Sequence, residues 1–339
     1  MTGMTRRGFL RTTKAATGVS VFGILSRRGD AAEFAWRYAT NLVPTHSMNV
    51  QLQHAVERIR QESGGRMEIQ IFPNNQLGGD TDMLSQLRTG VIELFNLSGL
   101  ILATVVPVAS INGIGFAFKD YDQVWAAMDG GLGAYVRSAI EKSGLFAFDK
   151  MWDNGYRQVT SSTHPINTPE DFNGFKIRVP VSPLWTSMFK RFRATPITIN
   201  FSELYNALKT KFVDGQENPL SLIEYNKFYE VQKYVSLTNH MWDGFWSLAN
   251  ARAWAALPSV LQDIVASNIN KAALQERHDI RKLNESLRDN LEQKSMIFNS
   301  TDPEKFRGTL RTSGFYTEWK EKYGSEAWAV FERQVGALG

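Results

Sequence analysis

The sequence of 339 residues contains no cysteine. This absence excludes structural disulfides, metal sites with thiolate ligands and catalytic thiols. A chain of this length can still fold stably through its apolar core alone, because the buried share of the surface rises with chain length. The composition, 43% hydrophobic and 12% aromatic, is sufficient for two packed domains of ordinary size.

The motifs of common enzyme classes are also missing. The five histidines show neither H-x-x-x-H nor H-E-x-x-H spacing, so no local metal site is indicated. The sequence has no G-x-S-x-G elbow, no Walker A loop and no G-x-G-x-x-G that follows a strand. We therefore expect no cofactor, no metal site and no catalytic residue. A catalytic site assembled from scattered residues stays open as an alternative.

The sequence has no apolar run of the 18 or so residues that a transmembrane helix needs.

Its first 32 residues differ in composition from the rest of the chain. Thr5-Arg6-Arg7-Gly8-Phe9-Leu10-Arg11 is a twin-arginine export pattern, and a mildly apolar segment follows it. We predict an export signal over residues 1–32, cleaved near Ala31 or Ala32, and a periplasmic location. The alternative is a basic amphipathic arm.

Removal of this segment changes the charge of the chain. Residues 1–32 carry six of the basic residues and one acidic residue, so the remainder has 32 basic and 33 acidic residues and a net charge of about −1. A nucleic-acid-binding surface requires an excess of basic residues. We therefore expect no nucleic-acid partner.

The N-terminal third alternates strand and helix patterns. Strands are predicted at 36–39, 67–72 and 92–97, with a helix capped by Ser47 after the first strand. This alternation is typical of an α/β fold with parallel, doubly wound sheets. Ligands of such sheets bind beyond the carboxyl ends of the strands, which points to the loop at 41–46 and to Ser98.

The stretch 176–220 contains the clearest candidate site. Arg178 lies in a short apolar strand, 176–179, where an arginine is rarely kept without a buried anionic partner. Ser182 and Pro183 can begin the next helix, and a further helix is predicted from Ser202 through Phe212. The polar run 214–219 then suggests a turn. A guanidinium beside a helix N-terminus is suited to hold a carboxylate.

Three segments carry a resemblance to a known family. They are Lys176-Ile177-Arg178-Val179-Pro180, Phe201-Ser202-Glu203-Leu204-Tyr205 and Val213-Asp214-Gly215-Gln216-Glu217-Asn218-Pro219-Leu220. The chain resembles, over residues 34 to 335, the solute-binding proteins of tripartite ATP-independent periplasmic (TRAP) transporters, the DctP family. The resemblance implies a two-lobed periplasmic-binding-protein fold with hinge strands.

We expect lobe I to comprise 33–154 plus 243–282 and lobe II to comprise 155–242 plus 283–339. From Pro258 to Lys294 there is no glycine and no further proline. The pattern predicts one long helix that contacts both lobes, and the resemblance implies the same.

The resemblance also implies ligand-binding roles. Arg178 would pair with the carboxylate of the substrate and Asn218 would bond to the same group. Arg157 would make a further contact, or else pair structurally with an acid between the lobes. Apart from the resemblance, we expect Ser98 and His240 to contribute from the first lobe and the hinge. The remaining candidates are residues that flank the predicted pocket or hinge: Trp152, Ser182 and Trp242.

The predicted function is capture of a small organic acid and its delivery to a permease. The resemblance implies the small and large membrane subunits of a TRAP permease as partners, and we expect the receptor to be a monomer. Aromatic residues near the pocket favour a monocarboxylate, a 2-oxo or 2-hydroxy acid or an aromatic acid. The alternatives are a C4-dicarboxylate or sugar-acid receptor, an exported enzyme acting on an organic acid, and a sensory receptor of the same fold.

Overall fold

Two mixed sheets of six strands each form the framework of the chain. The computed structural model describes residues 32–338, which form one compact unit, so the predicted export segment lies outside the described range except for Ala32. The first sheet has the order β2-β1-β3-β11-β4, with β5 paired to β11; the second has the order β12-β10-β6-β9-β7-β8. The strands are β1 (Phe34–Thr40), β2 (Met67–Phe72), β3 (Leu94–Ser98), β4 (Leu145–Ala147), β5 (Trp152–Tyr156), β6 (Gln158–Ser161), β7 (Lys176–Val179), β8 (Thr195–Thr198), β9 (Gly215–Asn218), β10 (Tyr234–Leu237), β11 (Trp242–Asn250) and β12 (Ile297–Ser300).

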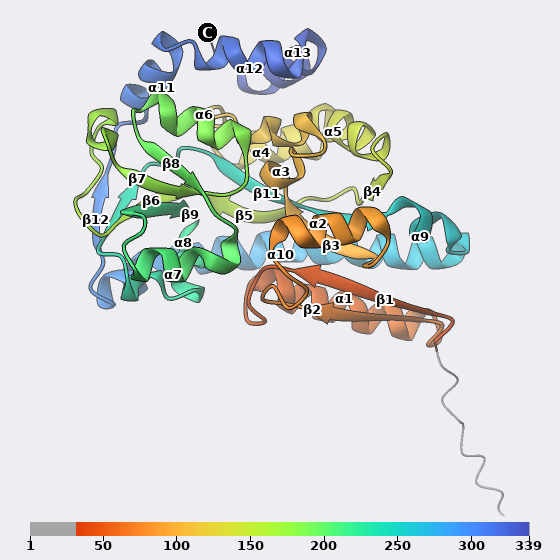
Figure 1. Cartoon of the computed structure of the whole chain (residues 1–339). Coiled ribbons are helices and arrows are strands. Elements are labelled where there is room, and N and C mark those ends of the chain that lie inside the picture. The colour runs from red at the N-terminus through yellow and green to blue at the C-terminus, as the bar shows by residue number, and fades with distance from the viewer. Residues whose placement is uncertain (1–31, 339) are drawn as a thin grey trace, which may run out of the picture. The chain divides into compact units, whose positions relative to one another are not determined.

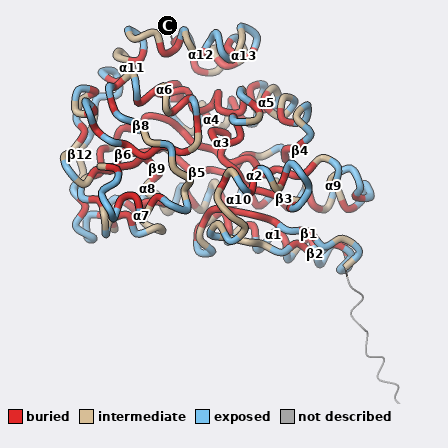
Figure 2. The backbone as a smooth tube through the Cα atoms, in the orientation of Figure 1, coloured by how far each residue is buried: buried red, intermediate tan, exposed pale blue. Residues whose placement is uncertain are grey.

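Helices cover both sheets, and the buried backbone follows the strands (Figures 1 and 2). The α-helices are α1 (Ser47–Glu62), α2 (Asp80–Thr89), α3 (Gly99–Leu102), α4 (Tyr121–Met128), α5 (Gly131–Glu141), α6 (Pro183–Arg191), α7 (Leu204–Lys209), α8 (Leu220–Tyr225), α9 (Ala251–Ala256), α10 (Ser259–Gln293), α11 (Pro303–Thr312), α12 (Phe315–Tyr323) and α13 (Ser325–Val335). Among the described residues, no helix is both long enough and apolar enough to cross a membrane.

The predicted α/β class is confirmed, and the strand pairing adds detail to it. Strands β1, β2 and β3 pair in parallel, as do β7, β8 and β9. Strand β11 instead runs antiparallel to β3, β4 and β5, and β6 runs antiparallel to β9 and β10. The chain passes from the first sheet to the second at Arg157, between β5 and β6, and returns before β11. The parallel pairing predicted for the first three strands is therefore confirmed. The antiparallel pairs involve strands that enter a sheet from the other half.

The long predicted helix is present as α10, which has 35 residues and is about 53 Å long at 1.5 Å per residue. Its first half packs on α1, where Leu261, Val265 and Ile269 join an apolar cluster with β1 and β2. Its last turns reach α8, and Leu291 belongs to a separate cluster with residues of α7, α8 and β10. One helix thus contributes to the cores of both halves.

The C-terminal helices also contact both halves of the molecule. Helices α11 and α12 pack on α6, and α13 packs on α4 and α5 (Figure 1). The aromatic residues Phe315, Trp328 and Phe331 are fully buried in the largest apolar cluster, which includes side chains from both groups of helices.

Two local predictions are wrong. The N-cap of α1 is His46, whose Nδ1 accepts a hydrogen bond from the amide of Met48 at 3.2 Å. The Ser47 hydroxyl instead donates to Glu276 of α10 at 2.8 Å, a tertiary contact that the local pattern cannot indicate. The helix predicted through Phe212 ends at Lys209, and Phe212 is exposed.

Candidate functional site

A small cavity lies where the two sheets approach each other. It measures about 20 Å³, close to the space that one water molecule occupies. Its charged and amide residues are Asn41, Asp80, Asn154, Arg157, Arg178, Asn218 and Asp243, and the others are Ser98, Ile101, Pro180, Phe201, Leu222 and Phe245. The two halves also meet beside it, where the amide of Asn200 donates to the Thr81 hydroxyl at 3.3 Å. Residues of both halves therefore line the cavity.

Arg178 has a position unlike that of the other arginine in the cavity. It lies in β7 with 1% of its surface exposed, and its Nε and Nη2 donate to the backbone oxygen of Ile199 at 2.9 and 2.7 Å. Within residues 32–338 no carboxylate forms an ion pair with it at 4.0 Å or less. Burial lowers the pKa of Arg178 to about 10, so the side chain is still a cation at neutral pH. A buried cation bonded only to a neutral carbonyl group attracts an anion.

Arg157 is neutralised by the protein itself. Its Nε and Nη2 bond to the Glu217 carboxylate at 2.6 and 2.8 Å, and its Nη1 bonds to Asp243 at 2.8 Å. The guanidinium also stacks on Trp185, 4.2 Å from the ring centroid. The structure thus places Arg157 in the cavity wall and also gives it the pairing that was the alternative to a ligand contact. Whether it contacts a ligand stays a prediction.

Asn218 comes from a strand, and the turn predicted for 214–219 is wrong. Strand β9 pairs antiparallel with β6 and parallel with β7, and its four residues are buried. Polar residues survive there because each has a partner: Gln216 donates to Thr160 at 2.9 Å, and the Asn218 amide donates to Gln216. Glycine is required at position 215 for a steric reason, since a Cβ there would lie 2.1 Å from the backbone oxygen of Thr160.

The wall from the first sheet is built on Asp243. The Ser98 hydroxyl donates to its Oδ1 at 2.6 Å, and the Asn154 amide donates to its Oδ2 at 2.9 Å. Ser98 is the last residue of β3, at the carboxyl end to which the rule for parallel strands points, and it lines the cavity. Asn154 and Asp243 were not among the predicted site residues, because the β5–β11 pairing that brings them together joins positions 89 residues apart.

Asn41 and Asp80 complete the wall. The Asn41 amide donates to Oδ1 of Asp80 at 2.8 Å, and both residues are buried. Burial raises the pKa of Asp80 to about 6, although Arg178 and the Asn41 hydrogen bond act to lower it. A signal for both residues existed in the sequence: Asn41 begins the loop after the first strand, and Asp80 begins the helix after Gly78-Gly79.

Four predicted site residues do not line this cavity. His240 is buried, with Nε2 3.1 Å from Glu217 and Nδ1 2.8 Å from the Thr238 hydroxyl. Burial lowers the pKa of His240, so the neutral ring donates to Glu217 and accepts from Thr238. Trp242 donates from its indole nitrogen to Asp153 at 2.8 Å, and Trp152 is fully buried. Their direct contact with a ligand stays a prediction.

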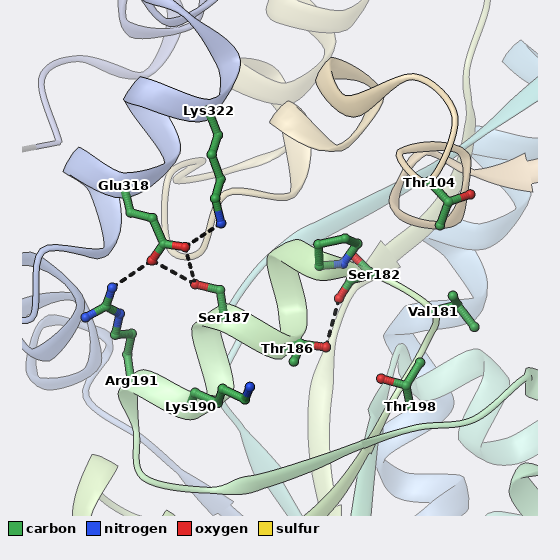
Figure 3. Close-up of a pocket in the computed structure, with 11 residues that line it drawn as sticks. Thr104, Val181, Ser182, Thr186, Ser187, Lys190, Arg191, Thr198, Glu318 and Lys322 are labelled. Carbon is green, nitrogen blue, oxygen red and sulfur yellow. Dashed lines mark hydrogen bonds and ion pairs between the residues drawn. The ribbon is translucent and has the colours of Figure 1, made fainter.

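The fourth residue, Ser182, lines a different pocket. It precedes Pro183, the first residue of α6, so the predicted start of this helix is correct, but its hydroxyl makes no capping bond. The pocket measures about 670 Å³ and lies between α6 and α12 (Figure 3). Glu318 joins the two helices there by accepting from Arg191 at 2.7 Å and from Ser187 at 3.1 Å.

The charged residues of the described chain do not form a recognisable metal centre. Within residues 32–338 no group of three or more histidine, aspartate or glutamate side chains is placed to hold a metal ion. The cavity combines the buried cation of Arg178, the arginine that is paired with Asp243, the acid Asp80 and a set of amide and hydroxyl groups. Such a set can bind a small anion that carries further polar groups.

Comparison with known proteins identifies the relatives of this chain. The model of the bacterial extracellular solute-binding protein family 7, DctP, matches residues 38–313. The 2,3-diketo-L-gulonate-binding periplasmic protein of Escherichia coli (strain K12) is 30% identical over 268 residues, which cover 79% of this chain and 81% of that protein.

Two solved structures show the same fold. The sugar acid binding protein of Advenella mimigardefordensis in complex with galactonate has a TM-score of 0.85 and 29% identity, with 88% of this chain and 97% of that chain covered. A TRAP periplasmic solute binding protein of Sulfurospirillum deleyianum with bound succinate has a TM-score of 0.83 and 26% identity, covering 90% of this chain and 99% of that chain.

Proposed function

Because the chain belongs to the bacterial extracellular solute-binding protein family 7, the DctP family of TRAP receptors, we propose that it captures a small organic acid through Arg178. The observation that carries this proposal is the charge state of the cavity. Arg178 is a buried cation bonded to a backbone carbonyl, whereas Arg157 beside it is paired with two carboxylates. A ligand carboxylate would supply the directly bonded anion that Arg178 lacks, through the bidentate geometry that a guanidinium favours.

The mechanism is enclosure of the acid between the two halves. Arg178 and Asn218 come from the second sheet, and Ser98 and Asp80 come from the first sheet or the helix after it, so an acid that contacts both groups holds the halves together. The acid favours the closed state only to the extent that it binds this state more tightly than the open one. Enclosure also removes water from the ion pair, which strengthens its attraction.

Arg157 would act through its neighbours in this mechanism. Its guanidinium fixes Glu217 and Asp243, and Asp243 in turn holds Ser98 and Asn154 at the cavity. His240 would support Glu217 from the other side. These residues keep the polar groups of the cavity in fixed orientations, so less conformational freedom is lost when a ligand binds.

The proposed partners are the small and large membrane subunits of a TRAP permease, and the proposed location is the periplasm after export by the twin-arginine route. We propose a binding protein rather than an enzyme, since the family and the relatives described above are named for binding. A coloured or metal-containing purified protein would favour the enzyme instead, and both properties are measured by absorption spectroscopy and elemental analysis.

Two groups of acids are candidates for the ligand. Apolar lining from Ile101, Phe201, Leu222 and Phe245 fits the predicted monocarboxylate, 2-oxo, 2-hydroxy or aromatic acid. The relatives support the predicted alternatives, sugar acids and C4-dicarboxylates, because their ligands are 2,3-diketo-L-gulonate, galactonate and succinate.

The experiment is a calorimetric titration of the purified chain, freed of co-purified ligand, with acids from each of these classes. At least one acid should bind, and Arg178→Ala should weaken its binding at least a hundredfold. Arg66→Ala is the matched control, since the Arg66–Glu33 pair is exposed and should leave binding unchanged. If Arg178→Ala binds the same acid within tenfold of wild type, the assignment of the site is wrong.

A further inference from the structure

The amide groups of Asn41 and Asn154 have a fixed orientation. Each nitrogen donates to a carboxylate, Asn41 to Asp80 at 2.8 Å and Asn154 to Asp243 at 2.9 Å. An ionised carboxylate has no proton to donate and can only accept hydrogen bonds, so the nitrogen and not the oxygen of each amide faces it. The two Oδ1 atoms are therefore left as acceptors.

These two acceptors are buried and unsatisfied. Neither Asn41 Oδ1 nor Asn154 Oδ1 has a hydrogen-bond donor in the part of the chain that the structure describes, and the residues are 5% and 1% exposed. Both residues line the cavity that contains Arg178. A buried acceptor without a donor is costly, so a ligand that brings donors to these atoms gains affinity.

Among the described residues that line the cavity, no second unpaired cation is present to bind a second carboxylate of the ligand. Its two arginines are Arg178 and Arg157, and Arg157 is already paired with Glu217 and Asp243. The remaining charged residue, Asp80, is an acid. A second carboxylate on the ligand would therefore meet repulsion from Asp80 or compete for Arg178.

We propose that this site selects a hydroxylated monocarboxylate, such as an aldonic or uronic acid, whose hydroxyl groups donate to the side-chain oxygens of Asn41 and Asn154. The proposal rests on the proposed function, because it assumes that the carboxylate binds Arg178. Phe201 and Phe245 fit the same ligand, since the carbon face of a polyhydroxy acid is apolar and its hydroxyl edge is polar. A hydroxyl-free acid would leave both amide oxygens without a donor.

The test compares acids that differ only in hydroxyl groups or in the number of carboxylates. The purified full chain is titrated with D-gluconate, D-galactonate and D-galacturonate, with hexanoate as the hydroxyl-free counterpart, and with galactarate and adipate as dicarboxylates. A four-carbon set uses D-erythronate, butanoate and succinate. Weak binders are measured by competition against the tightest ligand. At least one hydroxylated monocarboxylate should bind tenfold or more tightly than both of its counterparts.

Asn41→Leu separates recognition of hydroxyl groups from a structural effect. The variant should reduce the ratio of affinities for the hydroxylated and hydroxyl-free acids at least tenfold, whereas a merely structural change would weaken both acids alike. Asn206→Leu, at an exposed position on α7, is the control and should leave the ratio unchanged. The melting temperature without ligand shows whether each variant is folded.

The outcomes distinguish this proposal from the general one. If hexanoate, butanoate or a dicarboxylate is the tightest ligand, the proposal that the site selects hydroxyl groups is wrong. The proposal that the chain binds an organic acid is then still supported. An unchanged affinity ratio in folded Asn41→Leu also overturns the proposal that the site selects hydroxyl groups. If no acid of any set binds the wild type, both proposals fail.

Discussion

Arg157 and Glu217 form a buried bidentate ion pair, with Nε–Oε2 and Nη2–Oε1 distances of 2.6 and 2.8 Å. The pair joins the start of the second sheet to β9, and Asp243 extends it to β11 of the first sheet. Burial acts to raise the pKa of Glu217, but Arg157 and the hydrogen bond from His240 hold this pKa below its usual range. The buried side chains of Arg157, Glu217 and Asp243 thus link the strands of the two sheets through ion pairs.

Removal of Arg157 should destabilise the protein strongly. Arg157→Met leaves Glu217 and Asp243 buried without their counter-charge, and breaking one side of a buried pair costs about 3–5 kcal/mol. Urea unfolding followed by circular dichroism measures the loss. The exposed Arg66–Glu33 pair supplies the control, because Arg66→Met should change the free energy of unfolding by less than about 1 kcal/mol. Equal effects of the two substitutions would contradict a structural role for Arg157.

Removal of Arg178, unlike removal of Arg157, should not destabilise the ligand-free protein. Burial lowers its pKa from 12.5 to about 10, a shift worth about 3 kcal/mol of unfavourable desolvation for the charged form. Arg178→Met removes this cost together with two hydrogen bonds to Ile199, so the ligand-free variant should be at least as stable as wild type to within about 1 kcal/mol. Thermal and urea unfolding without ligand provide the check. A loss above 3 kcal/mol would mean that Arg178 is mainly structural.

Asp80 should make stability fall as the pH rises through weak acidity. Its pKa is about 6 in the folded chain against 3.8 as a free group, so between these pH values the folded state holds a proton that the unfolded state has lost. The contribution to the free energy of unfolding therefore decreases with rising pH, by up to about 3 kcal/mol from below pH 4 to above pH 6.

The variant Asp80→Asn tests this dependence. It should gain stability relative to wild type between pH 4 and pH 7, measured by urea unfolding without ligand at each pH. The exposed Asp289 supplies the matched control, Asp289→Asn, which makes the same substitution away from the cavity and is measured at the same pH values. A difference for Asp80→Asn that does not change with pH would contradict the raised pKa of Asp80.

Two glycines should respond in opposite ways to alanine. At Gly215 a Cβ would lie 2.1 Å from the Thr160 oxygen within a sheet, so Gly215→Ala should cost about 3 kcal/mol through overpacking. Gly308 lies in α11, and beyond its chain neighbours and the backbone of its own helix no heavy atom lies within 4 Å of the added carbon, so Gly308→Ala should stabilise by about 0.5–1 kcal/mol. Thermal unfolding of both variants decides, and a destabilised Gly308→Ala together with a neutral Gly215→Ala would refute the steric argument.

The parts of the fold that local patterns determine could be predicted from the sequence. The helix over 259–293 follows from a long stretch without glycine, and β2 follows from alternating residues. Strand β9 could not be predicted in this way, because its polar residues are typical of a turn until Arg157 and Thr160 supply their partners. Hydrogen bonds between distant segments override local preference there.

Some residues of the site could likewise be predicted from local sequence, and others could not. Arg178 stood out because an arginine in an apolar strand is unusual, and Ser98 followed from the rule for strand ends. Asn154 and Asp243 gave no such signal, since neither has an unusual sequence context and only the antiparallel pairing of β5 with β11 brings them together. A polar wall built from several strands is a property of topology.

The connectivity of the first sheet has a consequence for biosynthesis. Strand β11 lies between β3 and β4, so the sheet has a gap at its centre until residue 250 has been synthesised. The aromatic residues of α12 and α13, which enter the largest apolar cluster, come later still. A nascent chain therefore carries a long-lived, unfinished apolar surface, and contacts of such large sequence separation make folding slow. This architecture gives chaperones a wide interval in which to bind and makes nearly complete translation a condition for the native state.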